Sequence, residues 1–286
     1  MFADVALARR IEAAEARLSE GVVRLVMARR PQSRSFVEAL AGGVAVFGGP
    51  GSPFNKVVGA GFDGAPDAEP IERVERAFAE RRAPVQAEVA TLASPVFHAA
   101  LTRRGYVLQG FENVLGRPLS GEGPAGAPAG APSGVGIEVG ESTSADLARW
   151  MDIVVTGFEH LDATGAGSGV PPPPRDAVEQ VMADLAGAPG FRRYLARVDG
   201  TPAGGASLRL DESGVAQLTG AATLPSFRRR GVQRALLAAR LAVARAAGCD
   251  LAVITTQPGT QSQANAQRQG FDLLYTRAIL VRESGP

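Results

Sequence analysis

The sequence contains one succession of elements twice, and this repeat constrains the fold more than any other feature of the chain. When the chain is shifted by 165 residues, Arg103–Leu108 aligns with Arg268–Leu273, and further along Leu115 meets Leu280. Each copy is predicted to be a helix, a strand, a short helix, a glycine followed by an aromatic residue, and a strand, over about 45 residues. Chance similarity between two small α/β units is the alternative, but a register kept over this length favours duplication.

A stretch rich in glycine, proline and alanine separates the two copies. It has almost nothing to bury, which is typical of an interdomain linker. We therefore predict an N-terminal domain at 1–119, a linker at 120–134 and a C-terminal domain at 135–286. A length of 286 residues is more than one ordinary core holds, and 45% hydrophobic residues supply apolar material for two cores and exclude wholesale disorder.

The charge of the chain excludes nucleic acid as its main partner. Thirty basic and 29 acidic residues are interspersed and leave a formal net charge of +1. A protein that binds DNA or RNA as its main function normally has a strongly basic domain or face.

Cysteine and histidine are too rare for several kinds of site. Cys249 is the only cysteine, and the two histidines are His98 and His160. These numbers exclude an internal disulfide and a histidine-rich or multi-cysteine metal site, so we expect no metal, and Cys249 itself is predicted to be a small buried residue. The chain shows neither a signal-peptide pattern at Met1 nor an apolar run of 18 residues. We therefore expect a soluble cytoplasmic protein with no membrane partner.

Hydrophobic periodicity predicts the order βααβββαβαββ for the C-terminal domain. The expected strands are at 135–139, 193–198, 203–210, 215–224 and 251–256, followed by a final hairpin that ends at Arg282. The expected helices are at 144–156, 175–185, 232–247 and 261–269. In the N-terminal domain we expect strands at 57–62 and 85–92 and a helix at 71–82.

The segment Leu224–Leu237 contains the strongest functional signal, because three consecutive arginines stand where a strand ends and a long helix begins. Arg228, Arg229 and Arg230 lie at the positive end of the helix dipole, where cations are unfavourable unless an anion binds. Gly231, the free backbone amides and the guanidinium groups together fit a diphosphate. The alternative is a basic surface loop that happens to precede a helix.

Two other nucleotide-binding patterns are absent. The sequence has neither a GxxxxGK[ST] loop nor a GxGxxG turn followed by a ribose-binding acid after the relevant strands. The glycine-rich run from Gly48 to Lys56 does not have the spacing of a phosphate-binding loop, and we interpret it as a turn or a loop of a substrate pocket.

The succession of strand, Arg228–Gln233, helix, strand, short helix and Gly270-Phe271 resembles the GNAT superfamily of acyl-CoA-dependent N-acyltransferases over residues 135–283. The family pattern Gln/Arg-x-x-Gly-x-Gly/Ala is filled by Arg228 and Gly231, but Gln233 replaces the last small residue. The resemblance implies an α/β (α+β) fold with a mixed, mostly antiparallel twisted sheet flanked by helices. It also implies acetyl-CoA as co-substrate and an amine as acceptor.

The resemblance assigns CoA-binding roles to residues on both sides of the strand–helix junction. The backbone of the helix start would hold the CoA pyrophosphate, through Arg229, Arg230, Gly231, Val232, Gln233 and Arg234. Backbone groups at the end of the strand would bind the pantetheine and acetyl groups, through Ala222, Thr223 and Leu224. On the short helix, Asn265 is either a further CoA contact or a solvent-facing residue.

Acetyl transfer to an amine needs a base for the amine and an acid for the leaving thiolate, but no covalent nucleophile. Many family members use a tyrosine four residues before the Gly-Phe pair as the acid, and here that position is Ala266. The remaining candidate acid is Tyr275, for which packing is the alternative role. Glu159 and His160 are candidates for the base and the acceptor site.

A water molecule held by Gln217 and Thr219 is the alternative base. These two residues are therefore candidates for the acceptor site together with His160.

The N-terminal domain resembles a degenerate copy of the same family. The segment Asp63–Pro70, at the position equivalent to the arginine-rich junction, is acidic and would repel a diphosphate. This domain either packs against the C-terminal domain and walls the acceptor site, or is a scaffold alone.

We therefore predict an acetyl-CoA-dependent N-acetyltransferase that acts on a primary amine, most simply of a small molecule, as a monomer or a homodimer. Acetylation of a protein or peptide and a non-catalytic acyl-CoA-binding regulatory module are the alternatives.

Overall fold

The computed structural model describes residues 1–64, 66–119, 136–159 and 175–284, and within it the chain forms two compact units. The C-terminal unit consists of Leu115–Thr255 and Gly259–Asp272, with Met1. The N-terminal unit consists of Phe2–Val114, Thr256–Pro258 and the residues from Leu273 onward. The predicted linker at 120–134 lies outside the described residues, so the division into 1–119 and 135–286 stays a prediction.

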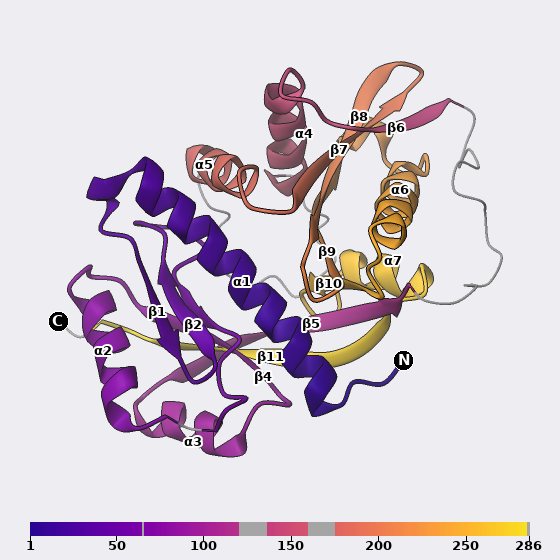
Figure 1. Cartoon of the computed structure of the whole chain (residues 1–286). Coiled ribbons are helices and arrows are strands. Elements are labelled where there is room, and N and C mark those ends of the chain that lie inside the picture. The colour runs from indigo at the N-terminus through magenta and orange to yellow at the C-terminus, as the bar shows by residue number, and fades with distance from the viewer. Residues whose placement is uncertain (65, 120–135, 160–174, 285–286) are drawn as a thin grey trace. The chain divides into compact units, whose positions relative to one another are not determined.

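The C-terminal unit is built on a sheet with the strand order β10-β9-β8-β7-β6 (Figure 1). The strands are β6 (Ile137–Glu141), β7 (Phe191–Val198), β8 (Thr201–Leu210), β9 (Val215–Thr223) and β10 (Leu251–Thr256). The last residues of β5 (Val107–Pro118), from Leu115 on, belong to this unit and lie next to β10. The ladders are antiparallel except that β9 and β10 are parallel.

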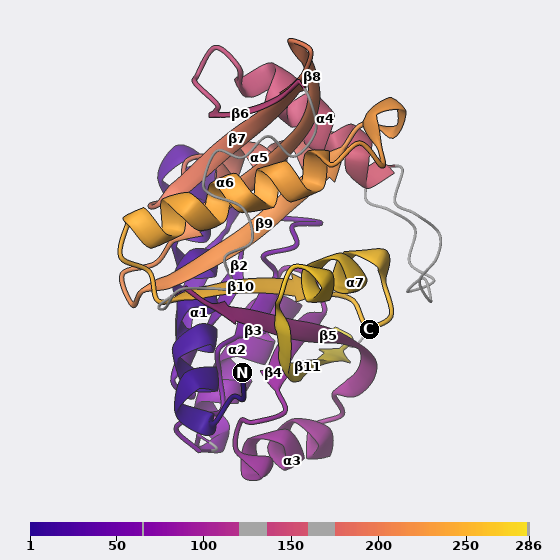
Figure 2. The ribbon, with the colours of Figure 1, turned by 90° about the vertical axis from the view of Figure 1, so that its right-hand side faces the viewer.

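Helices cover both faces of this sheet (Figure 2). They are α4 (Leu147–Glu159), α5 (Arg175–Leu185), α6 (Val232–Ala246) and α7 (Gln261–Arg268), and a 3₁₀ turn, η2 (Pro225–Phe227), precedes α6. Neighbouring glycines on β8 show that α6 and α4 lie on opposite faces. A methyl group on Gly204 would meet a methyl of Val232 in α6 at 2.6 Å, and one on Gly205 would meet a methyl of Val154 in α4 at 3.0 Å.

The core of this unit lies between α6 and the sheet. The apolar face of α6 recurs every three to four residues, as expected for an amphipathic helix. Cys249 is buried in the same cluster, as its sequence context predicted. The core side chains from α6 and the strands include Val232, Leu236, Leu241, Ala244, Tyr194, Leu208 and Leu218.

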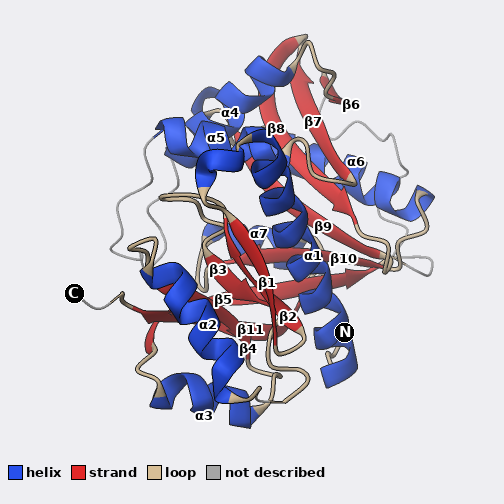
Figure 3. Cartoon of the chain, turned by 60° about the vertical axis from the view of Figure 1, so that its left-hand side comes forward, coloured by secondary structure: helices blue, strands red, loops and turns tan. Residues whose placement is uncertain are grey.

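The N-terminal unit has the strand order β1-β2-β3-β4-β11-β5, with helices packed around it (Figure 3). Its helices are α1 (Val5–Arg29), α2 (Ala68–Ala79) and α3 (Pro95–Arg103), and η1 (Pro31–Ser33) follows α1. Its strands are β1 (Phe36–Leu40), β2 (Gly43–Phe47), β3 (Lys56–Val58), β4 (Val85–Ala90), β11 (Asp272–Arg282) and most of β5. Within the described ranges, no helix has the length and apolarity needed to cross a membrane.

The glycine-rich run at Gly48 is a closed turn. Asn55 accepts a hydrogen bond from the Gly48 amide at 2.9 Å and donates one to the Gly49 carbonyl at 2.7 Å. Lys56, which follows, is buried and bonds Glu88 at 2.9 Å. This lysine is therefore occupied by a carboxylate.

The predicted fold class is confirmed: mixed α/β, with a mostly antiparallel sheet flanked by helices, and α5 and β10 have the predicted bounds. The predicted C-terminal hairpin is wrong, since Asp272–Arg282 is one continuous strand. This strand pairs antiparallel with β4 from Arg277 to Arg282. Because β4 is its partner, the segment does not need to turn back and pair with itself as a hairpin. The residues from Leu273 onward consequently group with the N-terminal unit, whereas they were predicted to belong to the C-terminal domain.

Candidate functional site

The two parallel strands of the C-terminal unit separate towards their carboxyl ends. Their paired residues are Leu251 with Val215, Ala252 with Ala216, and Val253 with Gln217. Beyond Gln217, β9 continues to Thr223 with no further partner on β10 among the registered pairs. Because both backbones run on unpaired with each other, their amides and carbonyls are available to an extended ligand at this edge.

A β-bulge lies in the part of β9 that has left β10. On β8, Gly205 pairs with Ala222 and Ser207 with Thr219, so Ala206 stands opposite two residues of β9. One of these two, Gly220, has a φ of 56°, which favours glycine. The bulge changes the direction of the strand just before the residues predicted to bind the acetyl and pantetheine groups.

The junction between β9 and α6 presents a helix N-terminus without a side-chain cap. Gly231 is the N-cap residue with a φ of 90°, and as a glycine it has no side chain that could cap the first amides of α6. Arg229 also has a positive φ, of 62°, so positive values alternate along the turn. Such alternation points successive N–H groups into one concavity, which suits an anion.

Three arginines of this junction have no counter-charge among the described residues. Arg229, Arg230 and Arg234 are exposed, and within the part of the chain that the structure describes no carboxylate pairs with them. The guanidinium of Arg230 lies 5.7 Å from the centre of the Phe227 ring. The first turn of α6 contains no acidic residue. Positive charge therefore accumulates where the helix dipole is already positive, as an anion site requires.

The end of β9 also contains an unpaired buried hydroxyl. Thr223 is buried, and its Oγ1 has no hydrogen-bond partner among the described residues. Its neighbour Ala222 packs so closely against α4 that a methyl group on Gly157 would lie 2.3 Å from the Ala222 side chain. The strand end is thus held tightly on the α4 side, and Thr223 has hydrogen-bonding capacity to spare.

Tyr275 belongs to the N-terminal unit and has a buried partner. Its hydroxyl donates to Glu12 at 2.7 Å, and Arg277 donates to the same oxygen at 2.7 Å. Burial, together with the Glu12 carboxylate, holds the pKa of Tyr275 well above its ordinary value of 10. These contacts favour the packing role over that of a catalytic acid.

The residues predicted to be the base or to bind the acceptor do not form one group in the described structure. Glu159 is the last residue of α4, and His160 lies outside the described residues. Gln217 is buried and accepts a hydrogen bond from Arg209, while the Thr219 hydroxyl lies 2.9 Å from Ser207 Oγ. Gln217 and Thr219 are therefore tied to β8, so their described contacts supply no argument for a water-binding pair.

The short helix α7 has no hydroxyl at the position of the usual acid, because Ala266 is buried there. Asn265 is exposed, and its side-chain oxygen accepts hydrogen bonds from Gln261, at 3.0 Å, and from Arg268. Its role as a CoA contact stays a prediction.

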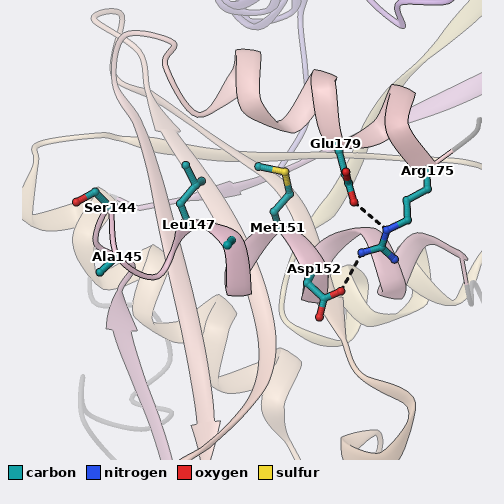
Figure 4. A pocket seen from close by; sticks show the side chains of 8 residues that line it. Ser144, Ala145, Leu147, Met151, Asp152, Arg175 and Glu179 are labelled. Atoms are coloured by element: carbon teal, nitrogen blue, oxygen red, sulfur yellow. Dashed lines mark hydrogen bonds and ion pairs between the residues drawn. The ribbon is translucent and has the colours of Figure 1, made fainter.

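A groove between α4 and α5 does not coincide with any predicted binding residue (Figure 4). Arg175 bridges Asp152 and Glu179 across it, at 2.8 Å each, so its charges are largely paired. Over the described ranges, no group of histidine, cysteine or acidic side chains is arranged to hold a metal ion.

Arg240, a buried arginine on α6, was not among the predicted functional residues. Its spacing was the available signal, because it stands four residues from both Leu236 and Ala244 in the apolar stripe of the helix.

Comparison with known proteins finds a family match within the C-terminal half of the chain. Residues 158–271 match the model of the acetyltransferase (GNAT) family. A comparison with curated protein sequences found no match.

Solved structures show the same fold along most of the chain. A GCN5-related N-acetyltransferase from Kribbella flavida is 20% identical with a TM-score of 0.60, covering 93% of this chain and 96% of that one. A tandem GNAT protein from the clavulanic acid biosynthesis pathway is 15% identical with a TM-score of 0.60, covering 93% and 88%. A GCN5-related N-acetyltransferase from Sphaerobacter thermophilus is 16% identical with a TM-score of 0.54, covering 76% and 68%.

Proposed function

We propose that this chain is a GNAT-type N-acetyltransferase whose C-terminal unit transfers an acetyl group from acetyl-CoA to a primary amine of a small molecule. The match of residues 158–271 to the acetyltransferase (GNAT) family supports this proposal. The observation that carries this proposal is the junction of β9 and α6. There, a helix N-terminus that begins at a glycine, together with Arg229, Arg230 and Arg234, which have no carboxylate partner among the described residues, follows a strand that has separated from its parallel neighbour.

The residues present fit a CoA thioester. Arg229, Arg230 and the amides from Gly231 to Arg234 would hold the pyrophosphate by charge-assisted hydrogen bonds. The unpaired edge of β9 at 222–224 would bind the pantetheine and the acetyl group through its backbone. The spare hydrogen-bonding capacity of Thr223 Oγ1 supports a polar ligand at this strand end.

The chemistry requires one bond to form and one to break. The amine nitrogen attacks the thioester carbon, the C–N bond forms, and the C–S electron pair leaves on sulfur. The sulfur finally receives the proton that the nitrogen gives up, so the products are an amide and CoA thiol. Backbone amides that donate to the carbonyl oxygen would stabilise the negative charge that develops on it. Glu159, at the end of α4, is the candidate base of this proposal.

Calorimetric titration with acetyl-CoA, followed by thiol release against a panel of small amines and peptides, tests the proposal. We expect saturable binding and thiol release that depends on a small amine. Release with peptides alone would replace the small-molecule acceptor with a peptide. An absence of CoA binding would contradict the proposal altogether.

A non-catalytic acyl-CoA-binding module is the second candidate. It is favoured by two observations: Ala266 occupies the place of the usual acid, and the Tyr275 hydroxyl is bonded to Glu12. Acetyl-CoA binding without thiol release for any acceptor would support this function.

A further inference from the structure

Arg240 is a buried guanidinium whose hydrogen bonds all go to backbone carbonyls. It is 3% exposed, and its Nε donates to the Leu236 carbonyl one turn earlier in α6 at 3.1 Å. Its Nη1 donates to the carbonyl of Ser207 at 2.9 Å and to that of Thr219 at 3.4 Å. None of the described carboxylates lies among its partners, and burial lowers its pKa to about 10, so it stays charged near neutral pH. Burying a charge without a counter-ion is costly, which calls for a compensating role.

The carbonyls that Arg240 binds flank the bulge in β9. Ser207 and Thr219 are the last paired residues before the register shifts, and Ala206 stands opposite the extra residue. Other side chains also donate to carbonyls at the bulge. Trp150 Nε1 donates to the Ala206 carbonyl at 3.2 Å, and Ser207 Oγ donates to the Thr219 carbonyl at 3.0 Å. At a bulge the regular ladder is interrupted, so these side-chain donors take the place of strand amides.

Arg240 therefore connects the two parts of the proposed site. It stands on α6, whose N-terminus would bind the pyrophosphate, and it holds the strand whose end would bind the acetyl group. An unsupported bulge could shift or straighten, and the backbone at 222–224 would then move relative to the helix.

We infer that Arg240 is a positioning residue for acetyl transfer: through the Ser207 and Thr219 carbonyls it fixes the bulge of β9, and with it the backbone that faces the thioester. This inference rests on the proposed function. It concerns turnover, whereas the binding of CoA by the α6 N-terminus should persist without it. Displacement of the catalytic backbone by a fraction of an ångström to one ångström is enough to lower kcat substantially.

The test compares Arg240→Met, which keeps the aliphatic volume and removes every donor, with Arg240→Lys, which keeps a charge and donors. The acceptor is the amine that the wild-type protein uses best, and the readouts are kcat, the KM for acetyl-CoA, the Kd for CoA and the melting temperature. For Arg240→Met we expect kcat to fall at least tenfold, with KM and Kd changed less than threefold. Arg240→Lys should recover most of the lost kcat.

Arg245→Met is the matched control, because Arg245 is an exposed arginine in the last turn of the same helix. It should leave kcat within twofold of the wild type. An unchanged kcat in Arg240→Met, or a loss of kcat with a parallel loss of CoA affinity, would overturn the inference, since the second result indicates general destabilisation. If Arg240→Met does not fold, Arg240→Gln, which removes the charge and cannot reproduce the guanidinium, takes its place and is judged by the same split between kcat and KM. A wild-type protein that turns over no amine defeats the proposed function instead, and the inference with it.

Discussion

The two units share a local arrangement of two parallel strands and a helix, but the residues around this arrangement differ in charge. Each has a parallel pair of strands registered over three residue pairs, β3 with β4 and β9 with β10, and in each a helix follows the first strand. In the N-terminal unit, however, β3 ends at Val58, its last paired residue, whereas β9 runs on to Thr223. The shared arrangement of strands does not by itself produce a site for an extended ligand.

The helix that follows differs in charge and in space. Before α2 stands Asp67, and Glu69 lies in its first turn, whereas α6 begins after Gly231 with no acid in its first turn. At the end of β3, a methyl group on Gly59 would lie 2.8 Å from the Glu12 carbonyl, because the backbone of α1 lies against it. Acidic residues and a packed helix therefore occupy the region that corresponds to the proposed anion site of the C-terminal unit, so a similar arrangement of strands and helix need not provide the same binding site.

If the N-terminal unit contributes structure alone, breaking its buried ion pair should affect stability and not ligand binding. Arg277→Met leaves Glu12 buried without its cation, because the two side chains are 2% and 1% exposed and 2.7 Å apart. We expect the free energy of unfolding to fall by about 3 kcal/mol, measured by urea denaturation. The Kd for CoA of the folded variant should stay within twofold.

Arg282→Met is the control for this change. Arg282 lies on the same strand and pairs with Glu75 at 3.0 Å, but its side chain is 40% exposed. Its loss should cost less than about 1 kcal/mol. Equal destabilisation by the two variants would contradict the structural importance of the Glu12–Arg277 pair.

Reversing the charge of the α6 junction should make it acidic, like the junction before α2, and should weaken CoA binding. In Arg229→Glu combined with Arg230→Glu, carboxylates would face the diphosphate, and we expect the Kd for CoA to rise at least tenfold, on the scale of one lost charge-assisted hydrogen bond. Calorimetry measures the effect. Arg76→Glu with Arg103→Glu, two exposed arginines of the N-terminal unit, changes the net charge equally and should alter the Kd less than twofold. A similar loss in both proteins would mean that net charge, and no specific site, governs binding.

A smaller effect is expected where α4 closes on β9. In Gly157→Ala the added methyl group would meet the Ala222 side chain at 2.3 Å, so α4 must move away from the strand end. Overpacking outweighs the better helix propensity of alanine, and we expect a loss of about 1 kcal/mol in the free energy of unfolding. Gly140→Ala on β6 meets no atom within 4 Å and should be nearly neutral. A Gly157→Ala protein as stable as the wild type would show that this contact is loose.

The smallest effect concerns pH and the N-terminal unit. Burial raises the pKa of Glu12 above its ordinary value of 4.5, so the native state binds this proton more tightly than the unfolded state does. The stabilising contribution is complete below the unfolded pKa and is lost as the pH rises through the folded pKa. As the pH rises from 4.5 to neutral, the free energy of unfolding of Glu12→Gln, measured by urea denaturation, should therefore fall less than that of the wild type. If the free energy of unfolding changes equally with pH in both proteins, other titrating groups determine the pH dependence in this range.

The regular elements of the C-terminal unit could be predicted because their patterns are local. The apolar stripe of α6 and the apolar run of β10 are visible in short windows of sequence. The α4 helix begins later than predicted, at Leu147, because Asp146 accepts hydrogen bonds from the amide and hydroxyl of Thr143 in a turn before the helix. Such a competing local turn is difficult to separate from a helix start by composition.

The remaining features depend on partners that are distant in sequence. Tyr275 and Glu12 are 263 residues apart, and nothing near either residue predicts their hydrogen bond. Likewise, the partners of Arg240 on β8 and β9 become known only when the register of those strands is known. The arginine-rich junction could be identified in advance because its charge, its glycine and its helix are contiguous in the chain.

The place of β11 also has a consequence for the order of events during synthesis. This strand, made from residues 272–282, lies between β4 and β5, both of which leave the ribosome much earlier. Until it emerges, the nascent N-terminal unit exposes an unfilled strand position and the apolar surface beside it. The half of the protein that is translated first is therefore the half whose folding is completed last, and a chain that ends just before β11 would contain every strand of the C-terminal unit but lack one of the N-terminal unit.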